Sequence, residues 1–312
     1  MNHKMNVLIT GGAGYLGGYY VKNLLQTDQV DRLVVYSRDE LKHFDLKLEL
    51  GDLARRVEFV IGDVRDLGRL NEVMNGIDLV IHSAALKQVD VCEENPSECL
   101  KTNVDGTRNV LESAKTSGVS QFIFISTDKA VEPVSVYGNS KQAGEKLVLK
   151  ANSESIKTNV LRLGNLIGSP GSIADKIRKR AIKEITLYDA LATRFVGNLE
   201  GAWELLEETM LLKNGGNMIL PRLKSIEVKD LIYSLDPTIK IREGDPRTFE
   251  KSHEKLANGS EMERAVQTQK MLIIPPQNLS EDEALDQFRG VKVSVKTYSS
   301  EECLVDATGL LK

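Results

Sequence analysis

Short apolar runs recur through the first half of the chain and alternate with amphipathic stretches. Each run is long enough for a strand and holds few polar residues, which is typical of strands buried on both faces of a parallel sheet. The predicted strands are Val7–Thr10, Leu33–Tyr36, Val57–Ile61, Asp78–His82, Phe122–Ile125 and Val160–Leu163.

The stretches between these strands have helical periodicity. Tyr15–Gln26 is predicted to be a helix, and a further helix is predicted to begin at Tyr137. The segment from Asn103 places apolar residues at spacings of three and four, and Gly118 is expected to end that helix. With right-handed crossovers, this order predicts an α/β fold with a doubly wound, Rossmann-like parallel sheet.

The regular alternation weakens after Leu163. Residues 164–172 are rich in Gly, Ser and Pro and are expected to form a loop that lines a cleft. A helix over 199–213 and a strand over 218–220 are predicted to pack back on the sheet. We therefore expect an NADP-binding Rossmann domain over residues 1–165, joined by 196–220, and a smaller substrate-binding lobe formed by 166–195 and 221–312.

Composition narrows the class of protein. The chain has 312 residues, 41% hydrophobic and 28% charged residues and a formal charge of -4, which argue against a broad nucleic-acid surface. No apolar run approaches the ~20 residues that span a bilayer, and the start leads straight into a strand, so a cytoplasmic protein without a signal peptide is expected. Three cysteines without Cys-x-x-Cys spacing indicate reduced thiols, and four scattered histidines make a metal site unexpected.

A glycine-rich loop follows the first strand and opens the first helix. Gly11 permits a tight turn, Gly14 lets a pyrophosphate approach the backbone, and Gly17 lets helix and strand pack closely. Tyr15 and Leu16 begin the helix, whose N-terminus favours an anion. The loop predicts a dinucleotide cofactor, and the alternative is a glycine-rich turn with no ligand.

The end of the second strand bears on the choice of cofactor. An acidic residue there would bind the ribose hydroxyls of NAD, but this chain has Ser37 and Arg38. Both can hold a 2′-phosphate, so NADP is favoured, unless Arg38 is only a solvated residue at a helix start. Asp63 and Val64, after the third strand, are expected near the adenine edge.

Five reactive side chains follow the fifth predicted strand. Tyr137 and Lys141 are one helical turn apart, so Lys141 can lower the pKa of the phenol and hold the nicotinamide ribose. Thr127 can share the substrate's hydroxyl proton, and Asp128 is a candidate acid. Lys129 can act as a base only with a depressed pKa, for which Lys141 and an oxidised nicotinamide are the expected causes. The alternatives are a turn-forming Asp128 and a surface-loop Lys129. Because Lys129 is expected in a loop at the sheet edge, its truncation is predicted to cost little stability.

These motifs resemble the extended short-chain dehydrogenase/reductases, and among them the soluble inverting UDP-N-acetylglucosamine 4,6-dehydratases of the polysaccharide-biosynthesis group. The resemblance covers nearly the whole chain and is strongest before about residue 170. It is carried by the stretches 11–17, 36–42, 61–67, 82–87, 95–103, 126–130, 137–141, 162–165, 193–195 and, in altered form, 247–254.

The resemblance implies further site residues and a reaction. Ala84, Ala85, Lys87 and Asn103 would contact the cofactor. The reaction would oxidise carbon 4 transiently, eliminate water across carbons 5 and 6, and return the hydride to carbon 6. It implies a homo-oligomer, dimer or hexamer. Lys87, Asn165, Ser172, Arg194, Arg247 and Glu250 would contact a nucleotide sugar.

Several positions depart from the family's pattern on the substrate side. Pro170, Ala192, Thr248 and Phe249 replace the usual residues, which leaves open the base, the sugar substituents and the outcome at carbon 5. Two other functions also stay open. A 4-epimerase needs Tyr137 and Lys141 but no base at carbon 5, and a non-catalytic NADP sensor needs neither residue.

Overall fold

The computed structural model describes residues 4–179 and 182–305. The chain divides into two compact units. The first comprises Met1–Ser126, Ser140–Leu161 and Leu206–Met218, and the second comprises Thr127–Asn139, Arg162–Leu205 and Ile219–Lys312. The expected division into a cofactor domain and a substrate lobe stays a prediction.

The largest sheet has ten strands in the order β16-β14-β15-β10-β6-β5-β4-β1-β2-β3. Its β3-β2-β1-β4-β5-β6 part has the doubly wound order, with parallel pairing in the registers of β1 with β2 and β4. All six predicted strands are confirmed. They are β1 (Met5–Thr10), β2 (Val30–Ser37), β3 (Val57–Ile61), β4 (Leu79–His82), β5 (Gln121–Thr127) and β6 (Lys157–Leu163).

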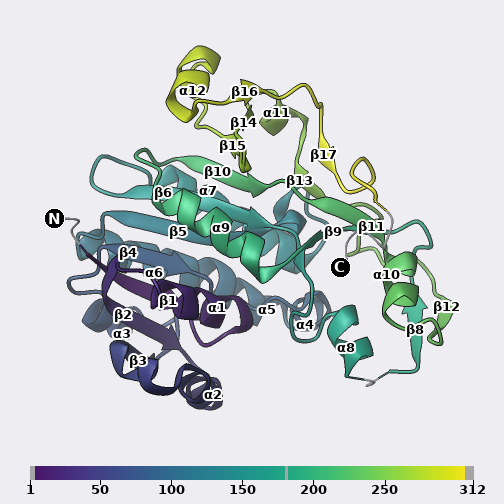
Figure 1. The fold of residues 1–312 in the computed structure, drawn as a ribbon, viewed down its shortest axis with the longest axis horizontal. Helices are drawn as coiled ribbons and strands as arrows, with labels where there is room; N and C mark the ends of the chain where they lie inside the picture. The colour runs from purple at the N-terminus through teal and green to yellow at the C-terminus, as the bar shows by residue number, and fades with distance from the viewer. Residues whose placement is uncertain (1–3, 180–181, 306–312) are drawn as a thin grey trace. The chain divides into compact units, whose positions relative to one another are not determined.

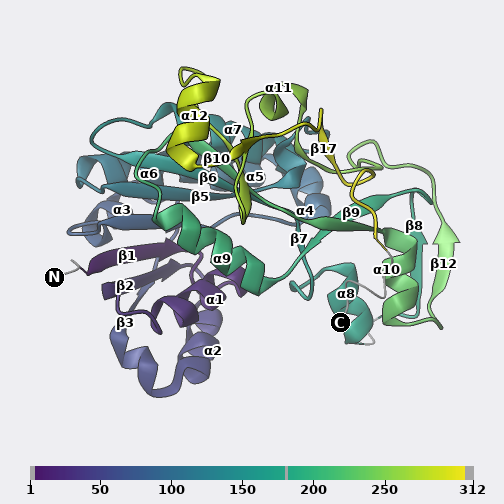
Figure 2. The same ribbon diagram turned by 45° about the horizontal axis from the view of Figure 1, so that its top comes forward.

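Helices cover both faces of this part of the sheet, with α1 and α2 on one face and α3 and α6 on the other (Figures 1 and 2). The predicted helix from Asn103 begins inside a π-helical turn, and Gly118 ends it with a positive φ of 75°. The helices and turns here are α1 (Tyr15–Leu24), α2 (Glu40–Leu50), η1 (Gly51–Arg56), α3 (Leu67–Val73), α4 (Val89–Glu94), α5 (Pro96–Leu100), η2 (Lys101–Asp105) and α6 (Gly106–Thr116).

The middle of the chain keeps the predicted helices with small shifts at their ends. The predicted helix over 199–213 ends at Met210, and the predicted strand over 218–220 lies within β10. The expected loop over 164–172 contains a short strand, β7, which pairs with β9. These elements are η3 (Asp128–Ala130), α7 (Val136–Lys150), β7 (Asn165–Leu166), α8 (Ile173–Arg178), β8 (Glu184–Leu187), β9 (Thr193–Gly197), α9 (Leu199–Met210) and β10 (Asn217–Pro221).

The last third contains more regular structure than its sequence indicates. The chain adds antiparallel strands to the large sheet, because β14 pairs antiparallel with both β15 and β16. Smaller sheets join β11, β9 and β7, β12 and β8, and β13 and β17. The elements are β11 (Lys224–Glu227), α10 (Val228–Leu235), β12 (Lys240–Glu243), β13 (Lys255–Ala257), α11 (Gly259–Met262), β14 (Val266–Gln267), β15 (Met271–Ile274), α12 (Glu281–Phe288), β16 (Val291–Lys292) and β17 (Tyr298–Ser299).

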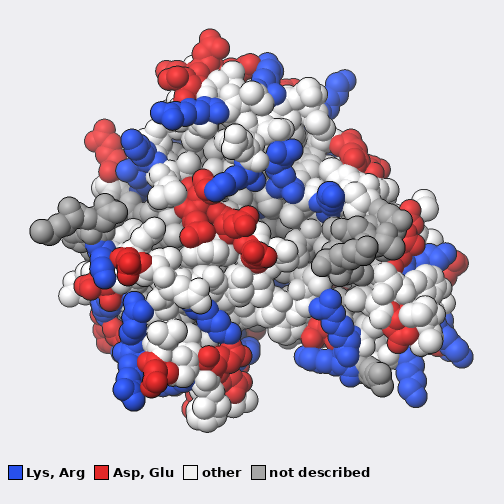
Figure 3. Space-filling model, viewed as in Figure 1, with Lys and Arg blue, Asp and Glu red and all other residues white. Residues whose placement is uncertain are grey.

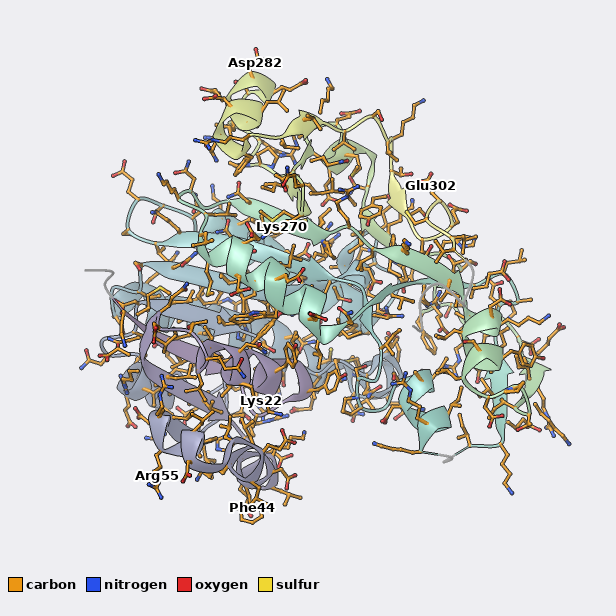
Figure 4. All side chains as sticks on the ribbon, viewed as in Figure 1. Lys22, Phe44, Arg55, Lys270, Asp282 and Glu302 are labelled. Atoms are coloured by element: carbon orange, nitrogen blue, oxygen red, sulfur yellow. The ribbon has the colours of Figure 1, made fainter. Side chains whose placement is uncertain are left out.

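The surface carries mixed charge. Acidic side chains gather over α9, which contributes Glu200, Glu204, Glu207 and Glu208, while Lys and Arg lie scattered elsewhere on the same face (Figure 3). On α2, Phe44 points away from the ribbon and is 57% exposed (Figure 4). Among the described residues, no helix is both long enough and apolar enough to cross a bilayer.

Candidate active site

The glycine loop after β1 is shaped as the sequence predicts. Gly11 has a φ of 68°, a conformation that favours glycine, and its N–H donates to the Tyr36 carbonyl at 2.8 Å. A Cβ at Gly17 would lie 2.4 Å from the Gly11 carbonyl oxygen, so the close approach of α1 to the loop requires glycine there. Gly14 caps α1 without a side-chain bond, and the first turn has no acidic residue. Backbone N–H groups of this helix end are therefore available to an anion.

The ends of β2 and β3 carry four predicted cofactor residues, of which Arg38 and Asp63 contact each other. The Arg38 guanidinium lies 3.5 Å from an Asp63 carboxylate oxygen, and Asp63 also pairs with Arg65 at 2.7 Å. The Ser37 hydroxyl bonds the His43 ring, so Ser37 already has a partner. Val64 is buried and its side chain lies against Gly106. Arg38 is 49% exposed and near a carboxylate, an arrangement from which a phosphate could recruit the guanidinium.

The loop after β4 lies against the glycine loop. A Cβ on Gly11 would lie 2.9 Å from the backbone of Ala84, whose N–H donates to the Thr10 hydroxyl. Ala85 is half-buried and Lys87 exposed in the same loop. Asn103 Oδ1 accepts from the Leu86 N–H at 2.8 Å, and Asn103 Nδ2 donates to the Leu86 carbonyl and to the Ser140 hydroxyl, each at 2.9 Å; its contact with the cofactor stays a prediction. Its side chain thus fixes this loop from within the protein.

Lys141 is buried in α7, one turn after Tyr137. Its Nζ donates to the Ile125 carbonyl at 2.7 Å and lies 3.8 Å from the centroid of the Phe124 ring. Burial lowers the pKa of Lys141 to about 7, against smaller raising effects of Glu145 and Cys99. Gly144 allows this packing, because a Cβ there would lie 2.7 Å from Phe124.

Tyr137 is buried at the start of α7, next to a glycine that the sequence analysis did not single out. A Cβ on Gly138 would lie 2.3 Å from the Lys129 carbonyl oxygen, so glycine lets the start of α7 contact η3. The Gly138 N–H donates to the Ser135 hydroxyl at 3.0 Å. The Tyr-Gly pair therefore holds the phenol-bearing turn against the turn that carries Asp128 and Lys129.

Asp128 is fully buried in η3, directly after β5. Its Oδ1 accepts from the Thr127 hydroxyl at 3.0 Å and from Lys129 Nζ at 3.1 Å, while its Oδ2 is buried and has no hydrogen-bond partner among residues 4–179 and 182–305. Burial raises the pKa of Asp128; Lys129 opposes this shift and the Glu254 carboxylate adds to it. An easily protonated carboxyl with an unused oxygen is the arrangement expected of a proton donor.

Lys129 is surrounded by oxygen acceptors. Its Nζ lies 3.1 Å from Asp128 Oδ1, 3.0 Å from Asn165 Oδ1 and 3.4 Å from Glu254 Oε1. Burial lowers the pKa of Lys129, but the carboxylates of Asp128 and Glu254 outweigh it and raise the pKa above its usual value. The expected depression of this pKa is therefore wrong for the protein without ligands. The surface-loop alternative also fails, since the side chain is 20% exposed and paired with buried carboxylates.

Glu254 and Lys251 complete this cluster and were missed by the sequence analysis. Lys251 Nζ pairs with Glu254 Oε2 at 2.9 Å and donates to the Val131 carbonyl at 2.8 Å. Both residues lie in the altered stretch 247–254, in which Arg247 and Glu250 were the residues predicted to contact the nucleotide sugar. The sequence shows only that Lys251 and Glu254 are three residues apart, and this spacing does not distinguish a buried pair from a surface pair.

The remaining predicted substrate residues fall into two places. Arg194 pairs with Glu250 at 3.3 Å and donates to the carbonyls of Thr193 and Ser252. Asn165 lies on Lys129. Arg247 stacks on Tyr188, 3.6 Å from the ring centroid, and Ser172 caps α8 by accepting from the Asp175 N–H.

Comparison with known proteins gives one family and several relatives. The polysaccharide biosynthesis protein family matches residues 7–276. An inverting UDP-N-acetylglucosamine 4,6-dehydratase of Campylobacter jejuni subsp. jejuni serotype O:2 is 36% identical over 88% of this chain and 84% of its own. A UDP-glucose 4-epimerase of Rickettsia canadensis is 34% identical over 83% of this chain and 79% of its own.

Solved structures share the fold. The X-ray structure of Pen from Bacillus thuringiensis superposes with a TM-score of 0.88 at 31% identity, covering 98% of this chain and 95% of that one. DesIV from Streptomyces venezuelae, a dTDP-glucose 4,6-dehydratase with NAD and TYD bound, gives a TM-score of 0.74 at 22% identity, covering 91% and 96%. The second likeness supports the fold alone.

Proposed function

This chain belongs to the polysaccharide biosynthesis protein family, and on that premise we propose that it is a nucleotide-sugar 4,6-dehydratase that uses NADP and acts on UDP-N-acetylglucosamine. The observation that carries the reaction type is the buried Asp128–Lys129 pair after β5. An epimerisation at carbon 4 needs a phenol and a lysine, which Tyr137 and Lys141 provide. A dehydration needs a further acid and a further base, and this pair is suited to both tasks.

The glycine loop fits a dinucleotide. Its uncapped helix end offers backbone donors to a diphosphate, and Gly11 and Gly17 keep the loop free of side chains that would block it. When bound, the nicotinamide supplies the capacity to take a hydride from carbon 4 and to return it to carbon 6. Lys141, with a pKa of about 7 before any ligand binds, would hold the ribose and favour the phenolate of Tyr137.

Tyr137 would take the proton of the carbon-4 hydroxyl. Thr127 would hydrogen-bond to the same substrate hydroxyl. The elimination then needs Lys129 as an amine and Asp128 as a carboxylic acid. One proton transfer along the 3.1 Å contact between Nζ and Oδ1 converts the resting ion pair into that state. Lys129 would then take the proton from carbon 5, Asp128 would give its proton to the departing carbon-6 hydroxyl, and the ion pair would be restored.

The NADP and substrate assignments rest on separate observations. Arg38 at the end of β2 supports a 2′-phosphate, although relatives of the same fold were solved with NAD. The carbon-5 inversion and the UDP-N-acetylglucosamine substrate are proposed from the named activity of the Campylobacter relatives. The Arg194–Glu250 pair is proposed to meet the nucleotide part of the substrate. Cytoplasmic location and homo-oligomerisation stay predictions.

The deciding experiment is to incubate the purified protein with UDP-N-acetylglucosamine in heavy water and to identify the product by NMR. We expect a 4-keto-6-deoxy sugar with deuterium at carbon 5, since the proton removed there exchanges before it is replaced. A product changed only at carbon 4, without deuterium at carbon 5, would replace the dehydratase by the 4-epimerase. That second candidate is favoured by the 34% identity to the Rickettsia epimerase.

A further inference from the structure

Beyond the residues assigned above, Glu254 occupies a special position in the second unit. It is 2% exposed, and its carboxylate lies between two lysines, 3.4 Å from Lys129 Nζ and 2.9 Å from Lys251 Nζ. Burying a carboxylate is costly unless it is paired, so this glutamate depends on both cations. Burial raises the pKa of Glu254, but Lys129 and Lys251 lower it to about 2, and the carboxylate is therefore ionised at neutral pH.

The backbone of Glu254 is fixed on both sides by one serine. The Glu254 N–H donates to the Ser300 hydroxyl at 2.9 Å, and the Ser300 N–H donates to the Glu254 carbonyl at 2.8 Å. The Ser300 hydroxyl also bonds the Thr193 hydroxyl on β9 at 2.6 Å. The segment that carries the Glu254 carboxylate is thus held by hydrogen bonds to Ser300 and, through Ser300, to β9.

Through its two lysines Glu254 reaches the middle of the turn η3 and the residue that follows the turn. Lys129 lies within that turn, and Lys251 donates at 2.8 Å to the carbonyl of Val131, the residue directly after it. Lys251, Glu254, Lys129 and Asp128 therefore form a row of alternating charges. The row has no net charge in the resting state. It also has none after a proton has moved from Lys129 to Asp128.

We propose that Glu254 is a positioning residue for the dehydration. It keeps the Lys129 amine in place before and after Lys129 loses its proton, and it sets the pH range in which the Lys129–Asp128 pair carries one proton. This inference rests on the proposed dehydratase function. The Lys129 ammonium donates hydrogen bonds to Asp128 and Asn165 and forms an ion pair with Glu254 at 3.4 Å. When the proton moves to Asp128, Asn165 and Glu254 still hold the amine.

The charges around the pair decide the direction of the expected pH effect. Glu254 raises the pKa of both Lys129 and Asp128, Lys251 lowers that of Asp128, and Arg194 lowers that of Lys129. Glu250 partly cancels the charge of Arg194 through their ion pair. Lys255 and Glu132 form an ion pair with each other, so their charges also partly cancel. Loss of the Glu254 charge therefore lowers both pKa values of the pair, and loss of the Lys251 charge raises the pKa of Asp128.

The test is the pH profile of kcat/KM for formation of the 4-keto-6-deoxy sugar. We expect Glu254→Gln to move the acid limb of the profile, which reports protonation of Asp128, by about one unit to lower pH, and Lys251→Met to move it to higher pH. Glu254→Asp keeps the charge and should keep the limbs in place with a lower rate. Glu261→Gln is the matched control, because Glu261 lies in the same unit and pairs with Arg162, and no ion pair between Glu261 and Lys129 is found among the described residues.

The outcomes separate the two proposals. A wild-type protein that makes no 4-keto sugar overturns the proposed function itself. Normal wild-type product formation, with limbs of Glu254→Gln and Lys251→Met that coincide with those of the wild type, overturns the role of Glu254. If Glu254→Gln does not fold, as judged by circular dichroism, the opposite shift in Lys251→Met and the unshifted profile of Glu254→Asp decide the question.

Discussion

Lys129 lies between two buried carboxylates, and these neighbours change the expected effect of removing it. Lys129→Ala should slow product formation ~10²–10⁴-fold because the base at carbon 5 is lost. It should also lower the free energy of unfolding by about 3 kcal/mol, because Asp128 and Glu254 lose a shared cation. Urea denaturation of the variant measures this loss, contrary to the small cost expected of a loop lysine.

Asp128→Asn combined with Lys129→Ala provides the control for that effect. Removing the buried charge together with its partner should restore part of the lost stability while the elimination stays inactive. Equal stability of Lys129→Ala and the wild type would show that the ion pairs contribute nothing to the fold.

Arg38 is the residue on which the choice of cofactor depends. Arg38→Asp should shift preference from NADP toward NAD, because the guanidinium that would pair with a 2′-phosphate is replaced by a carboxylate that accepts ribose hydroxyl bonds. The new carboxylate would also lie near Asp63, so total cofactor affinity should fall. Titration of both cofactors checks this, and unchanged discrimination would make Arg38 a bystander.

At the scale of elements, the start of α1 offers a pair of neighbouring glycines with opposite expectations. A Cβ at Gly17 would clash with the Gly11 carbonyl at 2.4 Å, whereas one at Gly18 would make ordinary contacts with Leu46 at 3.5 Å and the Gly12 carbonyl at 3.8 Å. Gly17→Ala should destabilise the protein by about 1–3 kcal/mol and weaken cofactor binding. Gly18→Ala should be neutral or stabilise it by up to about 1 kcal/mol, since alanine favours a helix. Thermal denaturation of both variants, with and without NADP, gives the comparison.

The elements of the first unit could be predicted because their signals are local. Apolar runs and glycine spacing identify β1 to β6 and the loop around Gly11, and the structure confirms them. The strands β14, β15 and β16 were missed because each is two to four residues long, too short for an apolar–polar period to show, and gains its place by pairing with another strand.

The site was predictable in part for the same reason. Asp128, Lys129 and Tyr137 follow one strand, so their proximity could be inferred from the chain. Glu254 approaches Lys129 from a segment far along the sequence, and no pattern within either segment indicates that contact. The pKa of Lys129 could not be anticipated because it depends on this distant carboxylate.

At the scale of the whole molecule, the proposed reaction leaves the cofactor unchanged after each turnover. Purified protein should therefore retain NADP and convert many equivalents of UDP-N-acetylglucosamine without added cofactor. Nicotinamide absorbance at the end of the reaction should equal that at the start. A need for one NADP per sugar converted would contradict a cycle in which the hydride is returned.

The segment Thr127–Asn139 leaves the first unit after β5 and re-enters it within α7. Thr127, Asp128, Lys129 and Tyr137 all lie on this short insertion, while the glycine loop and Lys141 lie outside it. Substitutions within this segment can therefore change the chemistry of the site while the residues of the dinucleotide-binding loop stay the same.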